Sequence, residues 1–461
     1  MLDHIDKTSG TPLYEQLYED IKRDILSGRL PTGAKLPSKR SISEQLGISI
    51  VTVENAYSQL IAEGYVRAAE RSGYFVQYSG DAVEVPQPPS SLPRSLEPDI
   101  GETCPEPQGD SVFPFTVWAR LMRSVILEKG TALLRPVSSG GAEELRAAIS
   151  EYLYHTRGIS VSPRQIIVGS GTEYLYNLLV QFFGRDRRYG IENPGFEKLP
   201  RIYSLNGADF ERINLDEQGM SLTELEQSGV SVAHISPAHH YPTGIVMPIS
   251  RRLGIMRWAE QSEERFIIED DYDSEFRRSG KPVPTMFGMD TAGKVIYINT
   301  FSQTIAPSVR ISYMCLPERL IPMWEERLGF YACSVPSFEQ YTLARFISGG
   351  YFERHISRMR KHYRRIFELV ARLSESFGGD VSISEETAPR AALAGLHFTI
   401  TIRRNAAAIT EIFTACGIRI KPLSEYYTPP EAAPKHRYVA NYAAAREDAL
   451  VQAVELRDRR R

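Results

Sequence analysis

Apolar residues recur at a helical spacing near the start of the chain. The residues that share one face of this predicted helix are Leu13, Leu17, Ile21 and Ile25. A spacing of four residues returns each side chain to nearly the same side of a helix, so we expect this face to pack inward. Gly28 ends the helix and Pro31 follows it, as is common at helix C-termini.

Two further helices are predicted in the next forty or so residues. The second begins at Ser38 or Ser41, with Glu44 as the capping-box partner of Ser41. The third begins after Ser49, which is an N-cap residue type, and ends at Gly64. Its inward-facing residues are Val53, Tyr57 and Leu60.

A hairpin follows the third helix. The segment "YVRAAERSGYFV" predicts two strands with Ser72 and Gly73 near the tip. Helices followed by a hairpin make a winged helix-turn-helix, whose third helix enters a major groove of DNA. Residues 10–77 closely resemble the GntR-type DNA-binding domain in "PLYEQLYEDIK", "ILSGRL", "KLPSKR", "LGIS", "EGYV" and "SGYFV". We therefore expect contacts with double-stranded DNA from Lys35, Ser38, Lys39, Arg40, Ser49, Thr52, Arg67, Arg71 and Gly73.

The charge of this first domain departs from the family pattern. Residues 1–78 hold nine Lys or Arg against ten Asp or Glu, a balance of −1, and no cation occurs between Arg40 and Arg67. The family usually has an Arg directly after the residue equivalent to Ser49, where this chain has Ile50. Because phosphate contacts supply most non-specific affinity, a single copy of the domain is expected to bind DNA weakly. A domain that only mediates protein contacts is the alternative.

The pattern changes twice after the hairpin. Residues 79–109 are rich in Pro, Ser and acidic residues, which predicts an extended linker between a domain at 1–78 and a domain at 110–461. In the second domain, strand-like apolar runs alternate with amphipathic helical stretches, the pattern of an α/β domain with a mostly parallel sheet. The predicted buried strands lie in "RQIIVGSG", "VAHISPAH", "RFIIEDDY", "KVIYINTF" and "RISYMCLP".

Composition excludes several classes of protein. A chain of 461 residues that is 42% hydrophobic and 24% charged is typical of a soluble globular protein, and no apolar run has membrane-spanning length. The polar N-terminus is not a secretory signal. The widely separated cysteines form no metal-ligand spacing and suit a reducing cytoplasm; they are Cys104, Cys315, Cys333 and Cys416. We therefore predict a cytoplasmic protein with no metal site.

The second domain resembles the fold-type I aminotransferases, which depend on pyridoxal phosphate (PLP), over nearly its whole length. Such a site needs backbone N–H groups for the phosphate, a ring that stacks on the pyridine and a carboxylate for the ring nitrogen. The resemblance assigns the PLP-binding positions to Ser170, Gly171, Thr172, Phe196, Asp270, Tyr272, Thr300, Ser302, Gln303 and Arg310. It places the loop that holds His239, His240 and Tyr241 near the ring.

The roles implied by this resemblance differ from residue to residue. Phe196 would stack on the ring, Asp270 would pair with its nitrogen and Tyr272 would approach the 3′-oxygen. The segment "IIEDDYDSEF" has a simpler alternative, a solvated acidic strand end. Arg310 offers a guanidinium to the phosphate, and Arg437 takes the position that holds a substrate carboxylate.

Gln303 occupies the position of the lysine that binds PLP covalently in these enzymes. An amide nitrogen is not nucleophilic, so Gln303 cannot form that bond. It also cannot carry protons at the substrate carbon near neutral pH. We therefore expect no catalytic residue at this position and no transaminase turnover. The sequence leaves open whether Gln303 is the native residue.

The order of the parts resembles the MocR/GabR class of bacterial regulators, in which a GntR-type domain precedes an aminotransferase-like domain. That class implies a transcriptional regulator that senses PLP, often with an amino compound, and forms a head-to-tail homodimer. Paired DNA half-sites would then compensate for weak binding by one copy.

Several alternatives stay open at this point. The site could bind PLP, pyridoxamine phosphate or a preformed PLP–amino acid adduct without a covalent bond to the chain. It could instead have been turned to another phosphorylated or carboxylated metabolite. The competing function is a PLP-dependent aminotransferase whose DNA-binding domain is vestigial.

Overall fold

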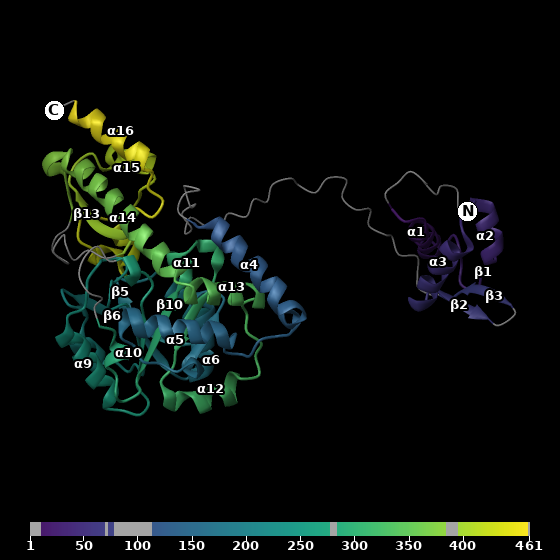
Figure 1. Ribbon diagram of the computed structural model, residues 1–461, viewed down its shortest axis with the longest axis horizontal. Helices are drawn as coiled ribbons and strands as arrows, with labels where there is room; N and C mark the ends of the chain where they lie inside the picture. The colour runs from purple at the N-terminus through teal and green to yellow at the C-terminus, as the bar shows by residue number, and fades with distance from the viewer. Residues whose placement is uncertain (1–10, 70–71, 78–112, 277–283, 384–394, 460–461) are drawn as a thin grey trace. The chain divides into compact units, whose positions relative to one another are not determined.

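The computed structural model describes residues 11–69, 72–77, 113–276, 284–383 and 395–459 (Figure 1). The chain divides into two compact units, Met1–Ile100 and Gly101–Arg461, which we call the head and the body. The predicted linker and the predicted DNA contact Arg71 lie outside the described residues. Within the described residues, no helix is both long and apolar enough to cross a membrane.

The head is a winged helix-turn-helix, as predicted. Its elements are α1 Leu13–Leu26, β1 Lys35–Leu36, α2 Lys39–Leu46, α3 Ile50–Ala62, β2 Val66–Ala69 and β3 Gly73–Val76. Leu17, Ile21 and Ile25 on α1 are buried against Val53 and Tyr57 on α3, so both predicted apolar faces are confirmed. The hairpin of β2 and β3 is also confirmed.

Two local details of the head differ from the sequence prediction. Helix α2 begins after Ser38, whose side chain accepts a hydrogen bond from the backbone N–H of Ser41. The predicted capping box of Ser41 and Glu44 is therefore wrong, because Ser41 already lies inside the helix. A third strand, β1, pairs with β3 and was not predicted. With two residues, it is too short to show an alternating pattern.

The body is built on a large sheet surrounded by helices (Figure 1). This sheet has eight strands in the order β4-β11-β10-β9-β8-β5-β6-β7. The strands are β4 Ile166–Gly169, β5 Arg188–Asn193, β6 Asp209–Asp216, β7 Gly219–Met220, β8 Val232–Ile235, β9 Phe266–Asp270, β10 Val295–Thr300 and β11 Ser312–Cys315. Strands β10, β9, β8, β5 and β6 run parallel, whereas β11 is antiparallel to both of its neighbours. All five predicted strands are confirmed; β5, β6 and β7 were not predicted.

Helices cover both faces of this sheet. Their bounds are α4 Phe115–Lys129, α5 Glu143–Arg157, α6 Thr172–Phe183, α7 Lys198–Leu205, α8 Leu222–Gln227, α9 Ile249–Glu260, α10 Met286–Met289, α11 Phe301–Thr304, α12 Ile321–Leu328 and α13 Ser337–Ser348. Alternate residues of β10 face opposite ways: Ile296 and Ile298 join the core beneath α6 and α12, whereas Tyr297 joins the core beneath α5 and α13. This alternation explains why the central strands contain consecutive apolar residues.

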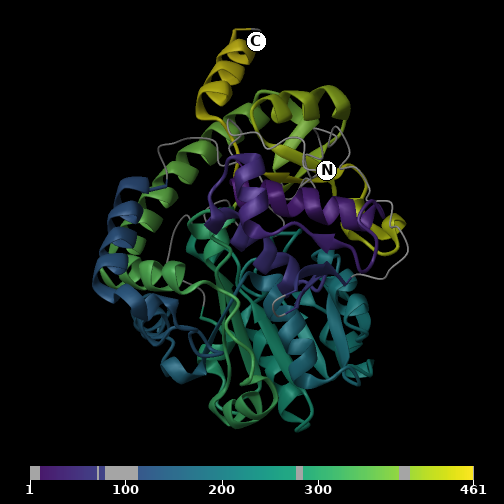
Figure 2. The same ribbon diagram turned by 90° about the vertical axis from the view of Figure 1, so that its right-hand side faces the viewer.

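A second, four-stranded antiparallel sheet lies at the far end of helix α14, Tyr351–Glu375 (Figures 1 and 2). Its order is β12 Val381–Ile383, β13 His397–Ile402, β15 Arg437–Asn441 and β14 Arg419–Pro422, with α15 Ala406–Ala415 and α16 Glu447–Asp458 beside it. This sheet has its own apolar core and was not predicted.

Candidate effector site and DNA-binding face

The register of the large sheet brings separate predicted segments to one edge. Gly169, Ser312 and Thr300 lie opposite one another across β4, β11 and β10. Asp270 pairs with Ile298 one strand further on. The turn after β4, the turn after β10 and the end of β9 therefore meet at the same edge, where ligands bind in open α/β sheets.

The acidic segment after β9 is buried, so a solvated strand end does not describe it. The buried carboxylates are those of Glu269, Asp270, Asp271, Asp273 and Glu275, each at most 7% exposed. Burial raises the pKa of Glu269 to about 7 and that of Glu275 to about 7. Carboxylates are held in such surroundings only where each has a defined partner.

The side chain of Asp270 contacts different residues from those that the neighbouring carboxylates contact. Its Oδ2 accepts a hydrogen bond from Tyr176 Oη at 2.5 Å and lies 3.8 Å from His234 Nε2. Its Oδ1 is buried and has no hydrogen-bond partner within the described residues. Neither Tyr176 nor His234 was predicted, because they lie 94 and 36 positions away and no local spacing links them to Asp270.

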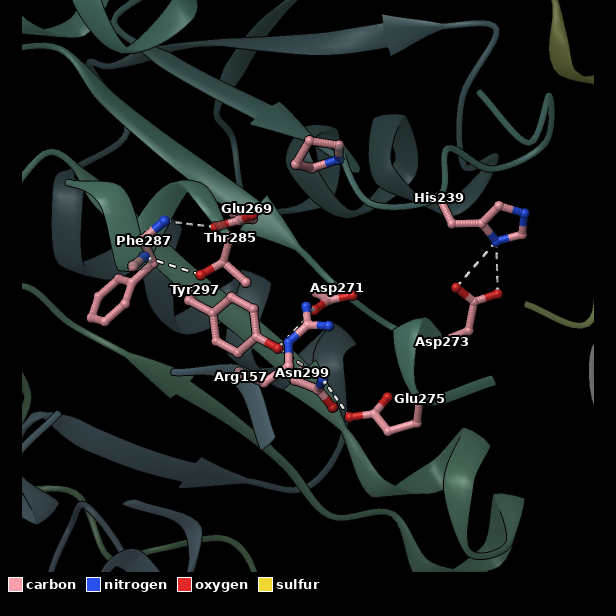
Figure 3. Close-up of polar contacts among 12 residues, drawn as sticks. Arg157, His239, Glu269, Asp271, Asp273, Glu275, Thr285, Phe287, Tyr297 and Asn299 are labelled. Atoms are coloured by element: carbon pink, nitrogen blue, oxygen red, sulfur yellow. Dashed lines mark hydrogen bonds and ion pairs between the residues drawn. The ribbon is translucent and has the colours of Figure 1, made fainter. Parts of the chain in front are cut away.

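The carboxylates on the other side of the strand belong to a structural network (Figure 3). Asp271 forms a buried ion pair with Arg157 and accepts a hydrogen bond from Tyr297 Oη at 2.8 Å. Asn299 Nδ2 bridges Tyr297 Oη at 3.0 Å and Glu275 Oε1 at 3.2 Å. These groups join α5, β9 and β10, so they fix the position of the strand end that carries Asp270.

Asp273 lies against the His239 loop. His239 Nδ1 is 2.9 Å from Asp273 Oδ2 (Figure 3). The hydroxyl of Tyr272 donates to the backbone carbonyl of His239 at 3.0 Å. His397 from β13 stacks on His239 with ring centroids 4.3 Å apart. The ligand-type atoms of His239, Asp273 and His397 lie within 4.8 Å of one another, close enough for a metal ion, although the His239–Asp273 hydrogen bond accounts for part of this grouping.

The predicted phosphate cradle opens helix α6. Gly171 is its N-cap with a φ of 98°, and a Cβ there would lie 2.6 Å from the guanidinium of Arg310, so only glycine fits. The structure thus brings Arg310 onto the turn that contains Ser170 and Thr172. Arg310 Nη2 is 3.0 Å from Glu173 Oε2, and Lys198 Nζ is 2.7 Å from Glu173 Oε1.

The residues of the turn after β10 differ in their burial and in their hydrogen bonding. Thr300 Oγ1 accepts hydrogen bonds from the N–H of Ser302 at 3.1 Å and from Ser312 Oγ at 2.8 Å, so it caps α11. Ser302 Oγ is buried and makes no hydrogen bond to any described residue. Gln303 is exposed.

Phe196 and Arg437 come from other parts of the chain than the turns after β4 and β10. Phe196 is half-buried and meets Tyr241 edge-on, with ring centroids 6.2 Å apart. Arg437 is the first residue of β15 in the small sheet. Burial raises the pKa of Tyr427, and the charge of Arg437 opposes that rise. Thr428 is tied to Asn193, just before the turn that carries Phe196, by two hydrogen bonds of 2.8 and 2.9 Å.

The predicted DNA contacts of the head gather around two rings of the wing. Lys35 and Arg67 lie opposite Phe75 on the two neighbouring strands, 5.9 and 5.2 Å from its ring centre. Lys39 lies 5.6 Å from the Tyr74 ring centre and pairs with Glu54 at 2.5 Å. The remaining described candidates are Ser38, Arg40, Ser49, Thr52 and Gly73. Cations therefore line the wing and the start of α2, not the recognition helix.

Comparisons with known proteins agree with this two-part architecture. Residues 13–76 match the family model for bacterial regulatory proteins of the gntR family, and residues 105–428 match that for aminotransferase class I and II. The chain is 30% identical to the probable rhizopine catabolism regulatory protein MocR of Rhizobium meliloti, over 93% of this chain and 90% of that protein. It is 29% identical to the pyridoxine biosynthesis transcriptional regulator PdxR of Corynebacterium glutamicum, over 90% and 89%.

A solved structure shares the fold of the body. The kynurenine aminotransferase of Pyrococcus horikoshii, crystallised in complex with PMP, aligns with a TM-score of 0.63 and 23% identity over 77% of this chain and 89% of that chain. Fold and matches together define a GntR-type DNA-binding domain joined to a fold-type I aminotransferase domain. The chain belongs to the MocR-type subfamily of GntR transcriptional regulators. It is thus a DNA-binding regulator with an aminotransferase-like domain.

Proposed function

We propose that the body binds PLP or a closely related phosphorylated pyridine without a covalent bond, and that this binding controls the attachment of the head to DNA. The observation that carries the proposal is a pair of buried, unsatisfied oxygens at one sheet edge. Asp270 Oδ1 and Ser302 Oγ have no hydrogen-bond partner in the described part of the chain. Such atoms cost free energy unless a ligand or an ordered water satisfies them.

The chain's own groups suit the two ends of such a ligand. Asp270 Oδ1 accepts the proton of a pyridine nitrogen, and Tyr176 holds the carboxylate in place through Oδ2. Arg310, the N-terminus of α6 at Thr172 and Ser302 Oγ receive the phosphate. When bound, PLP supplies an electron-withdrawing ring and an aldehyde. Phe196 offers the face of its ring to the pyridine, and Tyr272 approaches the 3′-oxygen.

Covalent attachment does not fit this site. Gln303 has no nucleophilic nitrogen. Lys294 is buried at the opposite end of β10, where its Nζ donates to the carbonyl of Ser262 at 2.7 Å. Lys198 lies near the phosphate end but is engaged by Glu173 at 2.7 Å. The aminotransferase reaction is therefore excluded from our proposal, and Arg437 serves to bind an effector carboxylate and not a reacting substrate.

The relative PdxR supports the choice of ligand, because its name places it in the regulation of pyridoxine biosynthesis. The proposal also includes a division at residues 1–78, 79–109 and 110–461, a head-to-tail homodimer and a cytoplasmic location. Such a dimer would present two recognition helices to paired half-sites, which compensates for a head with a charge balance of −1.

A PLP titration with a lysine-restoring variant tests the ligand. We expect saturable binding by the wild type with no pyridoxyl group on any lysine after borohydride reduction and mass mapping. Q303K should gain that group at residue 303. D270N should bind PLP at least about tenfold more weakly, since a hydrogen bond to a charged group contributes ~1.5–3 kcal/mol.

Three outcomes would contradict the proposal. Absence of PLP binding would favour another phosphorylated or carboxylated metabolite. A pyridoxyl group on a wild-type lysine, which a K198Q variant would locate, would refute the non-covalent mode. Multiple-turnover keto-acid formation from PLP and a panel of amino acids would support the alternative, an aminotransferase with a vestigial head.

The regulatory part is tested separately on DNA. Full-length protein should prefer the region upstream of its own gene over a random duplex at a stated moderate salt concentration, and PLP should change that affinity. Binding to both duplexes with equal affinity would remove the regulator from consideration, whatever the PLP titration shows.

A further inference from the structure

The first two residues of the recognition helix expose large aliphatic side chains. Ile50 is 47% exposed and Val51 is 63% exposed, whereas Val53, Tyr57 and Leu60 on the same helix are fully buried. The two exposed residues take no part in the apolar core of the head. Exposing these apolar side chains to water is unfavourable, and no packing contact in the core of the head offsets that cost.

The polar groups beside them are largely engaged with one another. Ser49 Oγ accepts the N–H of Thr52 at 3.1 Å and lies 2.8 Å from Thr52 Oγ1. The only charged residue within α3, Glu54, pairs with Lys39. The N-terminal turn of the helix therefore presents methyl groups as its main free chemistry.

DNA offers one apolar group in the major groove, the C5-methyl of thymine. The N-terminal residues of a recognition helix are those that reach base edges. We propose that Ile50 and Val51 select the operator by contacting thymine methyl groups. Sequence preference then comes from apolar contact at base edges, while the cations of the wing and of α2 supply phosphate contacts.

The surroundings favour DNA over a protein partner. Ile50 and Val51 directly follow Ser49, the N-cap of α3, and the exposed cation Arg40 lies at the start of the neighbouring helix α2. Two side chains are far too small a patch for a stable protein interface, which buries upwards of about 1,000 Å². Base edges need only such a small contact.

Uracil DNA tests the inference without any change to the protein. Uracil lacks only the C5-methyl of thymine and keeps its hydrogen-bonding groups. The probe is the duplex upstream of the gene, prepared once with thymine and once with uracil at every such position, and random duplexes prepared in the same two ways. We expect the full-length wild type to bind the uracil form of its own region about tenfold more weakly at fixed salt, with a much smaller change on random DNA.

Variants assign the effect to the two side chains. I50S/V51S should lose a similar factor on thymine DNA and should bind the thymine and uracil forms equally. Y14S is the matched control, because Tyr14 is an exposed apolar residue on α1, and it should keep the wild-type ratio. Amide hydrogen exchange over α3 checks that the double variant keeps its fold.

Two results would overturn the inference. One is equal binding of the two DNA forms by the wild type while it still prefers its own region over random DNA, which leaves the regulator function intact. The other is a changed oligomeric state of I50S/V51S with unchanged DNA binding, which would make the pair a contact between copies of the chain.

Discussion

The head and the body treat charge in opposite ways. In the head, Lys39 and Glu54 pair near the surface, and Lys35 and Arg67 lie over the Phe75 ring of the wing. In the body, Arg157 and Asp271 form an ion pair in the interior that is almost unexposed. One carboxylate oxygen of Asp270 has no hydrogen-bond partner among the described residues. We propose that both units bind anionic ligands. The Arg157–Asp271 pair of the body is shielded from water, whereas the Lys39–Glu54 pair of the head is not.

The difference follows from the size and solvation of the ligand. DNA approaches as a large solvated polyanion, so exposed cations that water and salt screen are sufficient. A small ligand must be recognised atom by atom, and buried groups with fixed partners hold each atom in place. We therefore expect single charge changes to be tolerated in the head and on the surface of the body, but not at the buried charges of the body.

The sharpest way to break this comparison is to remove one partner of a buried pair. Among the described residues, R157M leaves the buried carboxylate of Asp271 with only Tyr297 Oη as a donor. We expect the free energy of unfolding of the body to fall by about 3–5 kcal/mol. All three tryptophans lie in the body, so urea unfolding followed by tryptophan fluorescence reports on this unit.

The matched control removes an exposed pair of the same kind. Arg164 and Glu325 form two hydrogen bonds of 2.8 and 3.0 Å on the surface of the body. R164M should cost less than about 1 kcal/mol. Similar losses for the two variants would remove burial as the reason for the contrast.

A second prediction uses pH to isolate one buried carboxyl. Burial raises the pKa of Glu192 to about 8, while its Oε2 accepts the N–H of Ser236 at 3.0 Å. Between about pH 4.5 and 8 the folded state holds a proton that the unfolded state has lost, so stability falls as pH rises. From pH 7 to 8 the wild type should lose about 1 kcal/mol more than E192Q, measured by urea unfolding.

Other groups near Glu192 do not obscure this window. His240 lies 3.5 Å from Glu192, but burial lowers its pKa to about 3, so it stays neutral throughout. Glu269 and Glu275 contribute to both proteins equally. E325Q, which changes an exposed carboxylate, should keep the wild-type slope. A steeper loss in E192Q than in the wild type would contradict the assignment.

The smallest expected effect sharpens the comparison within the head. Ser38 caps α2 through its side chain, whereas Ser41 lies inside the helix. S38A should destabilise this helix by about 1 kcal/mol, and S41A should leave it nearly unchanged. Amide hydrogen exchange of α2 in the full-length protein should therefore accelerate about fivefold in S38A. Acceleration in S41A alone would restore the capping box that the structure removes.

Local patterns in the sequence were enough to predict much of the head and the central strands of the body. Helix faces and caps depend on neighbours three or four positions away, so Leu17, Ile21 and Ser49 could be interpreted locally. The five apolar strands between polar turns could be predicted from the sequence in the same way. The identity of Gln303 also came from sequence alone, because the loss of a nucleophile needs no coordinates to be recognised.

The tertiary structure decided what lies beside these residues. Hydrogen bonding to Asp270 comes from Tyr176, and the partner of Asp271 is Arg157, 114 positions away. Such pairs depend on sheet register and on helix packing, which no local pattern encodes. The exposure of Ile50 is another example. The sequence shows that the residue is apolar, but only the packing of α3 shows that it lies outside the core.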